Sequence, residues 1–132
     1  MKPSLNNVWG REINNQLRRF LNMPPLQDHD SGLLNLGIGQ DEYLLALEPA
    51  AAEEVALLSL FRKVDRFSLG SHLGALLQEV GIGKNLPAPV HLALKEPDSV
   101  VLTARIHRRA SNEAARYLDM LFVIYANADK RR

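Results

Sequence analysis

Hydrophobic residues near the N-terminus recur at helical spacing. Polar side chains, among them Arg11 and Arg18, occupy the positions between them. This amphipathic spacing predicts a helix over residues 4–22, with Ser4 as its N-cap. Pro24-Pro25 is expected to stop the helix, because proline lacks an amide hydrogen and restricts the residue before it. The apolar row consists of Leu5, Trp9, Ile13, Leu17 and Leu21.

After a polar loop over residues 27–32 the apolar period changes from 3.6 to 2. Alternation over residues 34–39 and again over 43–48 predicts two half-buried strands, joined by a turn at 39–41. Residues 55–61 are apolar at every position except Ser59, which favours a strand covered on both sides. A helix over residues 53–66 is the alternative, because alanine, glutamate and leucine are good helix formers.

The second half of the chain also contains helical spacing and alternation. Residues 68–80 have helical spacing, and the glycines at 81 and 83 end it. Alternation over residues 90–95 and 100–106, around a turn at 96–99, predicts a hairpin. Ser111 is predicted to cap a last helix that runs to Ala128, with residues 129–132 as a flexible tail.

The resulting order is αβββαββα. It predicts an α+β fold in which helices flank a twisted antiparallel sheet. The length of 132 residues suits one domain, and no linker or repeat divides residues 1–132.

Composition excludes several classes of protein. The apolar fraction of 46% is too high for global disorder. No apolar run approaches the roughly 18 residues of a membrane span, and the first residues lack the apolar core of a secretion signal. The chain has no cysteine, which removes disulfides and thiolate chemistry. These features fit a cytoplasmic protein that does not insert into membranes.

Charge is almost balanced. There are 16 Lys and Arg residues against 15 Asp and Glu, a net charge of +1. Nucleic-acid binders usually carry a large basic excess, so no nucleic-acid partner is predicted. Basic clusters at residues 18–19, 105–109 and 130–132 are interpreted as solvated surface.

Motifs for catalysis or metal binding are missing. The four histidines fall in four different predicted elements and none has a metal-ligand spacing, and Asp28-His29-Asp30 makes a poor cation cage without further ligands. Gly37-Ile38-Gly39 lacks the third glycine of a dinucleotide loop, and Gly81-Ile82-Gly83-Lys84 lacks the upstream glycine of a phosphate loop. We therefore predict no catalytic residue, no cofactor and no metal, and hence no enzyme. The histidines are His29, His72, His91 and His107.

Two features suggest an interaction protein. Gly70 and Gly74 lie one turn apart on a predicted helix, which lets another backbone approach closely. The alternative is that they pack against the protein's own sheet. Trp9 is the single tryptophan, and it serves either a binding surface or simply the core.

The order of elements and the placement of apolar residues resemble the class I chaperones of bacterial type III secretion, the group that includes the Tir chaperone. The resemblance spans Leu5–Ala128. It includes the Leu34-Asn35-Leu36 entry into three strands, Leu73-Gly74-Ala75-Leu76-Leu77 in the second helix, and the Gly81-Ile82-Gly83 exit into a hairpin.

This resemblance implies a homodimer in the bacterial cytoplasm. It would bind the N-terminal chaperone-binding segment of secreted virulence effectors. It would keep that segment extended and export-competent and deliver it to the secretion apparatus, whose ATPase is a candidate partner. An adaptor that binds another secretion component on the same fold is the alternative. By position, the effector groove would involve Trp9, Ile13, Leu17, Leu34, Leu36 and Ile38, and the dimer contact Gly70, Leu73, Gly74 and Leu77.

One property departs from the family. Its members are commonly acidic, whereas this chain has a net charge of +1 and a pI near 8.1. The difference argues against a purely electrostatic capture of cargo and does not bear on the fold.

Overall fold

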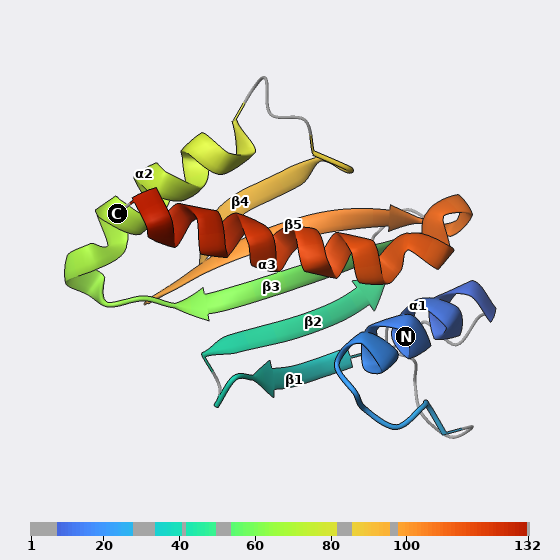
Figure 1. Ribbon diagram of the computed structural model, residues 1–132. Coiled ribbons are helices and arrows are strands. Elements are labelled where there is room, and N and C mark those ends of the chain that lie inside the picture. The colour runs from blue at the N-terminus through green and yellow to red at the C-terminus, as the bar shows by residue number, and fades with distance from the viewer. Residues whose placement is uncertain are drawn as a thin grey trace.

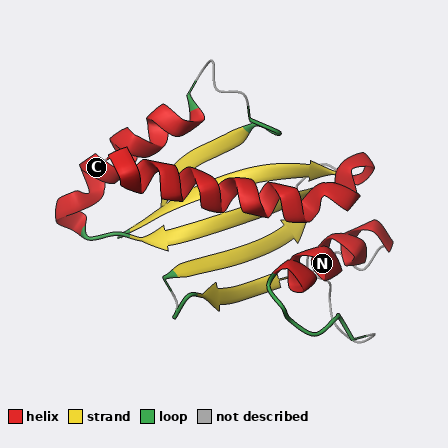
Figure 2. Ribbon diagram, in the orientation of Figure 1, coloured by secondary structure: helices red, strands yellow, loops and turns green. Residues whose placement is uncertain are grey.

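The computed structural model describes residues 8–27, 34–40, 42–49, 54–81, 86–95 and 98–131. Within them the chain forms an α+β fold in the predicted order αβββαββα (Figures 1 and 2). The helices are α1 (Val8–Phe20), α2 (Leu69–Val80) and α3 (Ala114–Arg131), with short 3-10 turns η1 (Arg66–Ser68) and η2 (Arg108–Glu113) before the last two. The strands are β1 (Leu34–Ile38), β2 (Tyr43–Pro49), β3 (Val55–Lys63), β4 (Val90–Lys95) and β5 (Ser99–His107).

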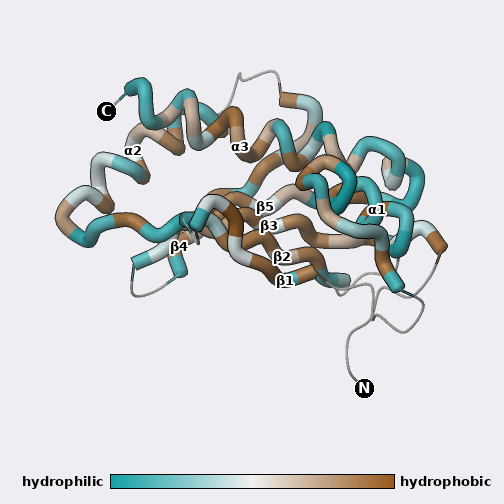
Figure 3. Tube along the Cα trace, turned by 60° about the horizontal axis from the view of Figure 1, so that its bottom comes forward, coloured by the Kyte–Doolittle hydropathy of each residue, from teal (hydrophilic) through white to brown (hydrophobic). Residues whose placement is uncertain are grey.

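The strands form one antiparallel sheet in the order β1-β2-β3-β5-β4. Strand β3 lies at its centre, paired with β2 on one side and β5 on the other. The prediction of a strand over residues 55–61 is therefore confirmed against the helical alternative, but the expected cover on both sides is not, since no described helix lies over its second face (Figure 3). A central strand whose two faces are both apolar gives no alternation in the sequence.

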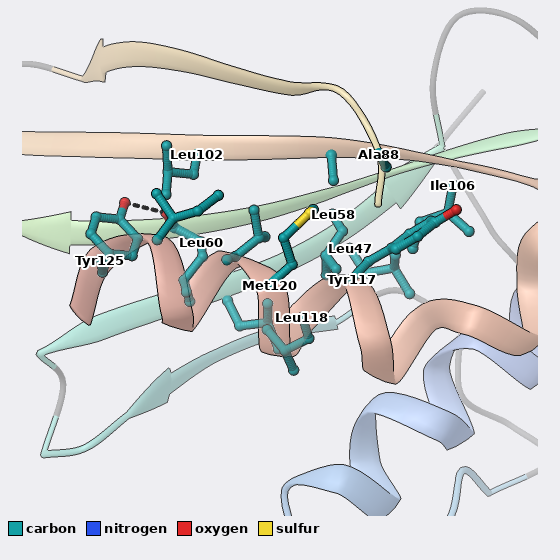
Figure 4. Close-up of a cluster of buried hydrophobic side chains, with 14 of the residues drawn as sticks. Leu47, Leu58, Leu60, Ala88, Leu102, Ile106, Tyr117, Leu118, Met120 and Tyr125 are labelled. Carbon is teal, nitrogen blue, oxygen red and sulfur yellow. Dashed lines mark hydrogen bonds between the residues drawn. The ribbon is translucent and has the colours of Figure 1, made fainter. Parts of the chain in front are cut away.

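The helices lie on one face of the sheet (Figure 3). Side chains from β2, β3 and β5 meet α3 there and form the core shown in Figure 4. Tyr125 of α3 is 1% exposed, and its hydroxyl donates a hydrogen bond of 2.7 Å to the carbonyl of Leu60. Helix α3 is thereby attached to the central strand by a buried polar contact as well as by apolar packing.

Helix α1 ends before the two prolines. Asn22 has a φ of 58°, and the amide of Met23 donates to the carbonyl of Arg18 at 2.7 Å. This is the Schellman arrangement, with asparagine at the left-handed position that glycine usually takes. The predicted start of the helix, including Ser4 and Leu5, lies outside the described residues.

Two predictions about the C-terminal helix are wrong. Ser111 does not cap it, since this residue lies inside η2 and is buried, and α3 begins at Ala114. Residues 129–131 are not a flexible tail but the last turn of α3. Asp129 accepts a hydrogen bond from Arg62 at 2.8 Å, and Arg131 bonds Glu79 and Gln78 of α2. These contacts to β3 and α2 hold the last turn in place.

Candidate functional site

The histidines remain dispersed in the structure. His72 is buried on α2, whereas His91 and His107 are exposed on β4 and β5. His29 and the Asp28-His29-Asp30 segment lie outside the described residues. In the described ranges, three or more potential metal ligands nowhere gather closely enough to hold an ion. None of the described helices is long and apolar enough to cross a membrane.

Strand β1 lies at one edge of the sheet and, among the described strands, pairs with β2 alone. Its apolar residues face the helix layer, and their exposure increases along the strand. Leu34 is 4% exposed, whereas Leu36 and Ile38 are half-buried. Helix α1 lies beside the beginning of β1 (Figure 1), which explains why the first leucine is the best covered.

The exposed end of β1 continues into an apolar surface, the β1 strip, made of Leu36, Ile38, Tyr43 and Phe122. Tyr43 stands directly opposite Ile38 in the β1–β2 pairing. The Tyr43 ring lies 5.3 Å from the ring of Phe122 on α3, edge to face. All four side chains are half-buried and pack against the core on one side. The strip therefore places accessible apolar surface next to a strand edge.

The structure divides the six predicted groove residues into two groups. Ile13 and Leu17 are 0% exposed, and Leu34 joins them in the core. These three residues support a binding surface but do not offer one. Trp9, Leu36 and Ile38 are half-buried at the margin of the core. That the accessible residues contact a polypeptide stays a prediction.

Next to the strip, a cationic side chain packs against two neighbouring aromatic rings, whose centroids lie 5.4 Å apart. The guanidinium carbon of Arg62 lies 5.5 Å from the Tyr43 ring centroid and 5.7 Å from that of Tyr125. The same guanidinium forms ion pairs with Asp129 at 2.8 Å and Glu42 at 3.3 Å. Through these contacts the cluster connects Tyr43 of β2 with β3 and with the last turn of α3.

Burial and neighbouring charges shift the pKa values of the residues in this cluster. It raises the pKa of Tyr43, with nearby Arg62 acting in the opposite direction. Burial also raises the pKa of Tyr125, far more strongly. Burial lowers the pKa of Arg62, but the hydrogen bond that Arg62 donates to Asp129 and the surrounding charges outweigh burial and leave that pKa raised. At neutral pH the cluster therefore consists of a charged arginine packed against two neutral tyrosines.

The predicted dimer residues lie on the outer side of α2. A Cβ atom added at Gly70 or Gly74 would meet nothing within 4 Å. The alternative that these glycines pack against the protein's own sheet is therefore wrong. Leu77 is 57% exposed, and Leu73 is half-buried. A hollow of about 450 Å³ runs beside them, lined by Gly70, Ser71, Gly74, Ala75, Gln78 and Arg131.

Sequence reasoning did not include Tyr43 and Phe122 in the site. The alternation of β2 already places Tyr43 on the same face as Leu45 and Leu47, which was a usable signal. The position of Phe122 beside Tyr43 depends on how α3 crosses the sheet. No local pattern encodes that crossing.

Comparison with known proteins assigns no family to this chain. The chain matches no family model and no curated protein. Among solved structures it is similar to "YbjN, a putative transcription regulator from E. coli", with 12% sequence identity and a TM-score of 0.44. The similarity covers 87% of this chain and 90% of that chain.

Proposed function

We propose that this protein is a non-catalytic chaperone that binds an extended polypeptide segment along the edge of β1. In the form suggested by the resemblance to class I type III secretion chaperones, the segment is the N-terminal chaperone-binding region of a secreted effector. The protein keeps this region extended in the bacterial cytoplasm and delivers it to the export apparatus.

One observation carries the proposal: an edge strand lies directly beside accessible apolar side chains. An added strand pairs its amides and carbonyls with the edge, and its alternate side chains contact one face of the sheet. On the helix side of β1 that face is the β1 strip, with Leu36 and Ile38 on the strand itself. Backbone pairing thus supplies affinity without sequence preference, and the strip supplies selectivity for apolar residues.

The electrostatic environment agrees with this mode of binding. The strip is apolar, and the arginine nearest to it is already neutralised by Asp129 and Glu42. Recognition through backbone pairing and apolar contact does not need the acidic surface common in the family. The net charge of +1 is therefore compatible with the proposal.

Dimerisation through the outer side of α2 forms part of the same proposal. The exposed glycines leave room for a second backbone, and Leu77 and Phe67 supply exposed apolar surface, with Phe67 92% exposed. Because α2 lies at the β4 side of the sheet (Figure 1), a contact there leaves the β1 edge of each subunit accessible.

Affinity purification from the native cytoplasm, followed by mass identification and limited proteolysis of the bound partner, tests the function. We expect a secreted protein in which a short N-terminal segment is protected from protease by the complex. A partner that is bound only through a folded domain would favour the adaptor alternative. Recovery of the protein without any polypeptide partner would refute both.

A further inference from the structure

The sheet face opposite the helices carries an apolar row across all five described strands. The register places Gly37 opposite Leu44, Leu44 opposite Phe61, and Phe61 opposite Val101, with Ala93 completing the row on β4. Residues one position away on each strand point into the core, so the row points to the other side. No described helix covers this face (Figure 3).

The shape of the row suits a docked ligand. Leu44 and Phe61 are half-buried and offer the accessible apolar surface of the row, whereas Val101 is only 8% exposed. The two ends of the row are Gly37 and Ala93, which have little or no side chain. Five strands at about 4.8 Å spacing give a length of about 19 Å, which accommodates roughly 13 residues of helix.

In the neighbouring row on the same face, the two central polar side chains already bind each other. The hydroxyls of Ser59 and Thr103 lie opposite each other and are hydrogen-bonded at 3.0 Å. Both hydroxyls therefore keep a hydrogen bond when a ligand covers them. This lowers the free-energy cost of excluding water from this face.

The margin of this face is basic. Lys63, Lys95 and Arg105 are exposed, and Glu48 is the one carboxylate among the described strand residues that point this way. The ammonium of Lys95 lies 4.9 Å from the ring centroid of Phe61, so positive charge reaches the apolar row itself. The face is thus apolar along the middle and cationic at its margin.

We propose that this face binds a second, acidic polypeptide: an amphipathic helical segment whose apolar side chains cover the row. Its carboxylates pair with Lys63, Lys95 and Arg105. Complementary charge of this kind sets the orientation and raises the association rate. The surface is separate from the β1 strip, since the two lie on opposite faces of the sheet.

The same charges argue against two other occupants. A second copy packed face to face would bring its three cations against the same three cations. Single-stranded nucleic acid is usually held by several stacking aromatic rings, whereas Phe61 is the one aromatic residue among the described strand positions of this face. An acidic polypeptide satisfies both the apolar row and the basic margin.

Two synthetic 18-residue helical peptides test the proposal. They share one leucine and alanine face and carry either glutamate or lysine at every polar position. Each is titrated into the isotope-labelled full-length protein, and backbone amide shifts are recorded. We expect the glutamate peptide to produce saturable shifts at Leu44, Phe61 and Val101, and the lysine peptide to produce none there.

The double variant Lys63→Glu/Arg105→Glu should weaken binding of the glutamate peptide about tenfold or more. The control Arg66→Glu/Lys130→Glu has the same net charge, but both exposed residues lie outside the sheet, in η1 and α3, and it should bind within about twofold of the wild type. Equal binding of both peptides, shifts confined to other surfaces, or equal loss in both variants would overturn the proposal. The proposal would also be overturned if the amides of the row shifted on self-association or on addition of a single-stranded oligonucleotide, but not on addition of the glutamate peptide.

Discussion

Arg62 of β3 donates a hydrogen bond of 2.8 Å to the carboxylate of Asp129, one turn from the end of α3. The Arg62 side chain is only 12% exposed, whereas the Asp129 side chain is 35% exposed. The pair therefore joins the rim of the sheet to the end of the last helix in a partly dehydrated site, and it does so beside the aromatic residues of the β1 strip.

Replacement of Arg62 by methionine should lower the free energy of unfolding by about 1–2 kcal/mol, because two ion pairs and two cation–π contacts are lost together. Urea unfolding followed by circular dichroism measures the change. Arg116→Met is the matched control, since its pair with Glu113 is exposed on both sides. The control should change stability by less than about 0.5 kcal/mol. Equal effects of the two variants would refute a special role for the buried pair.

Stability should fall as the pH rises above about 10, the value at which tyrosine titrates in the unfolded chain. Burial raises the pKa of Tyr125 in the folded state, so the folded protein retains a proton that the unfolded chain releases. Tyr125→Phe should flatten this slope and cost about 1 kcal/mol at pH 8 through the lost bond to Leu60. Urea midpoints between pH 8 and 11 measure both effects. An unchanged slope in the variant would contradict the assignment.

Gly74→Trp should convert the expected dimer into a monomer without loss of fold. The position is exposed and an added Cβ meets nothing within 4 Å, so the subunit itself tolerates a side chain. In a symmetric contact the substitution acts twice. Light scattering and circular dichroism measure the mass and the fold. A wild-type protein that is monomeric at about 50 μM, where a micromolar interface is mostly occupied, would contradict the dimer.

Asp substitutions should separate the core from the binding surface. Leu36→Asp and Ile38→Asp place a charge at half-buried positions, so the fold should survive while affinity for cargo falls about 30- to 1,000-fold. Leu34→Asp buries the charge and should destabilise the fold by more than about 3 kcal/mol. Leu94→Asp, an exposed leucine at the other edge of the sheet, should change neither property. Circular dichroism and effector co-purification provide the two readouts.

If Leu36→Asp and Ile38→Asp both fold and still retain cargo, the β1 strip is not the binding surface. If both unfold, the two side chains belong to the core and the strip does not offer a binding surface.

Periodicity was sufficient to predict the elements and their order. Alternation located β1, β2, β4 and β5, since one face of each strand is better covered than the other. It was ambiguous for β3, where Leu58 faces the core while Phe61 lies in the row on the opposite face. The prolines were expected to end α1, but the helix ends at the left-handed Asn22, where the amides of Asn22 and Met23 donate to the carbonyls of Arg19 and Arg18.

Function-related positions were harder to predict because an apolar row does not reveal what covers it. Leu34 and Leu36 share the alternation of β1, yet only Leu36 remains accessible, because α1 lies beside the start of β1 and not its end. The contacts of Asp129 with Arg62 likewise join residues 67 positions apart, and local composition had indicated a tail. Such tertiary contacts decide which apolar residues a ligand reaches.

Hydrogen exchange of the β1 amides tests the central claim most directly. The complex recovered by affinity purification is compared with the free protein, and exchange is followed in Leu34–Ile38 of β1 and Val90–Lys95 of β4, the two edge strands among the described residues. If cargo adds as a strand at β1, amides of β1 that exchange rapidly in the free protein become protected in the complex, while those of β4 keep their rates. Unchanged exchange in β1, or protection confined to β4, would contradict the account.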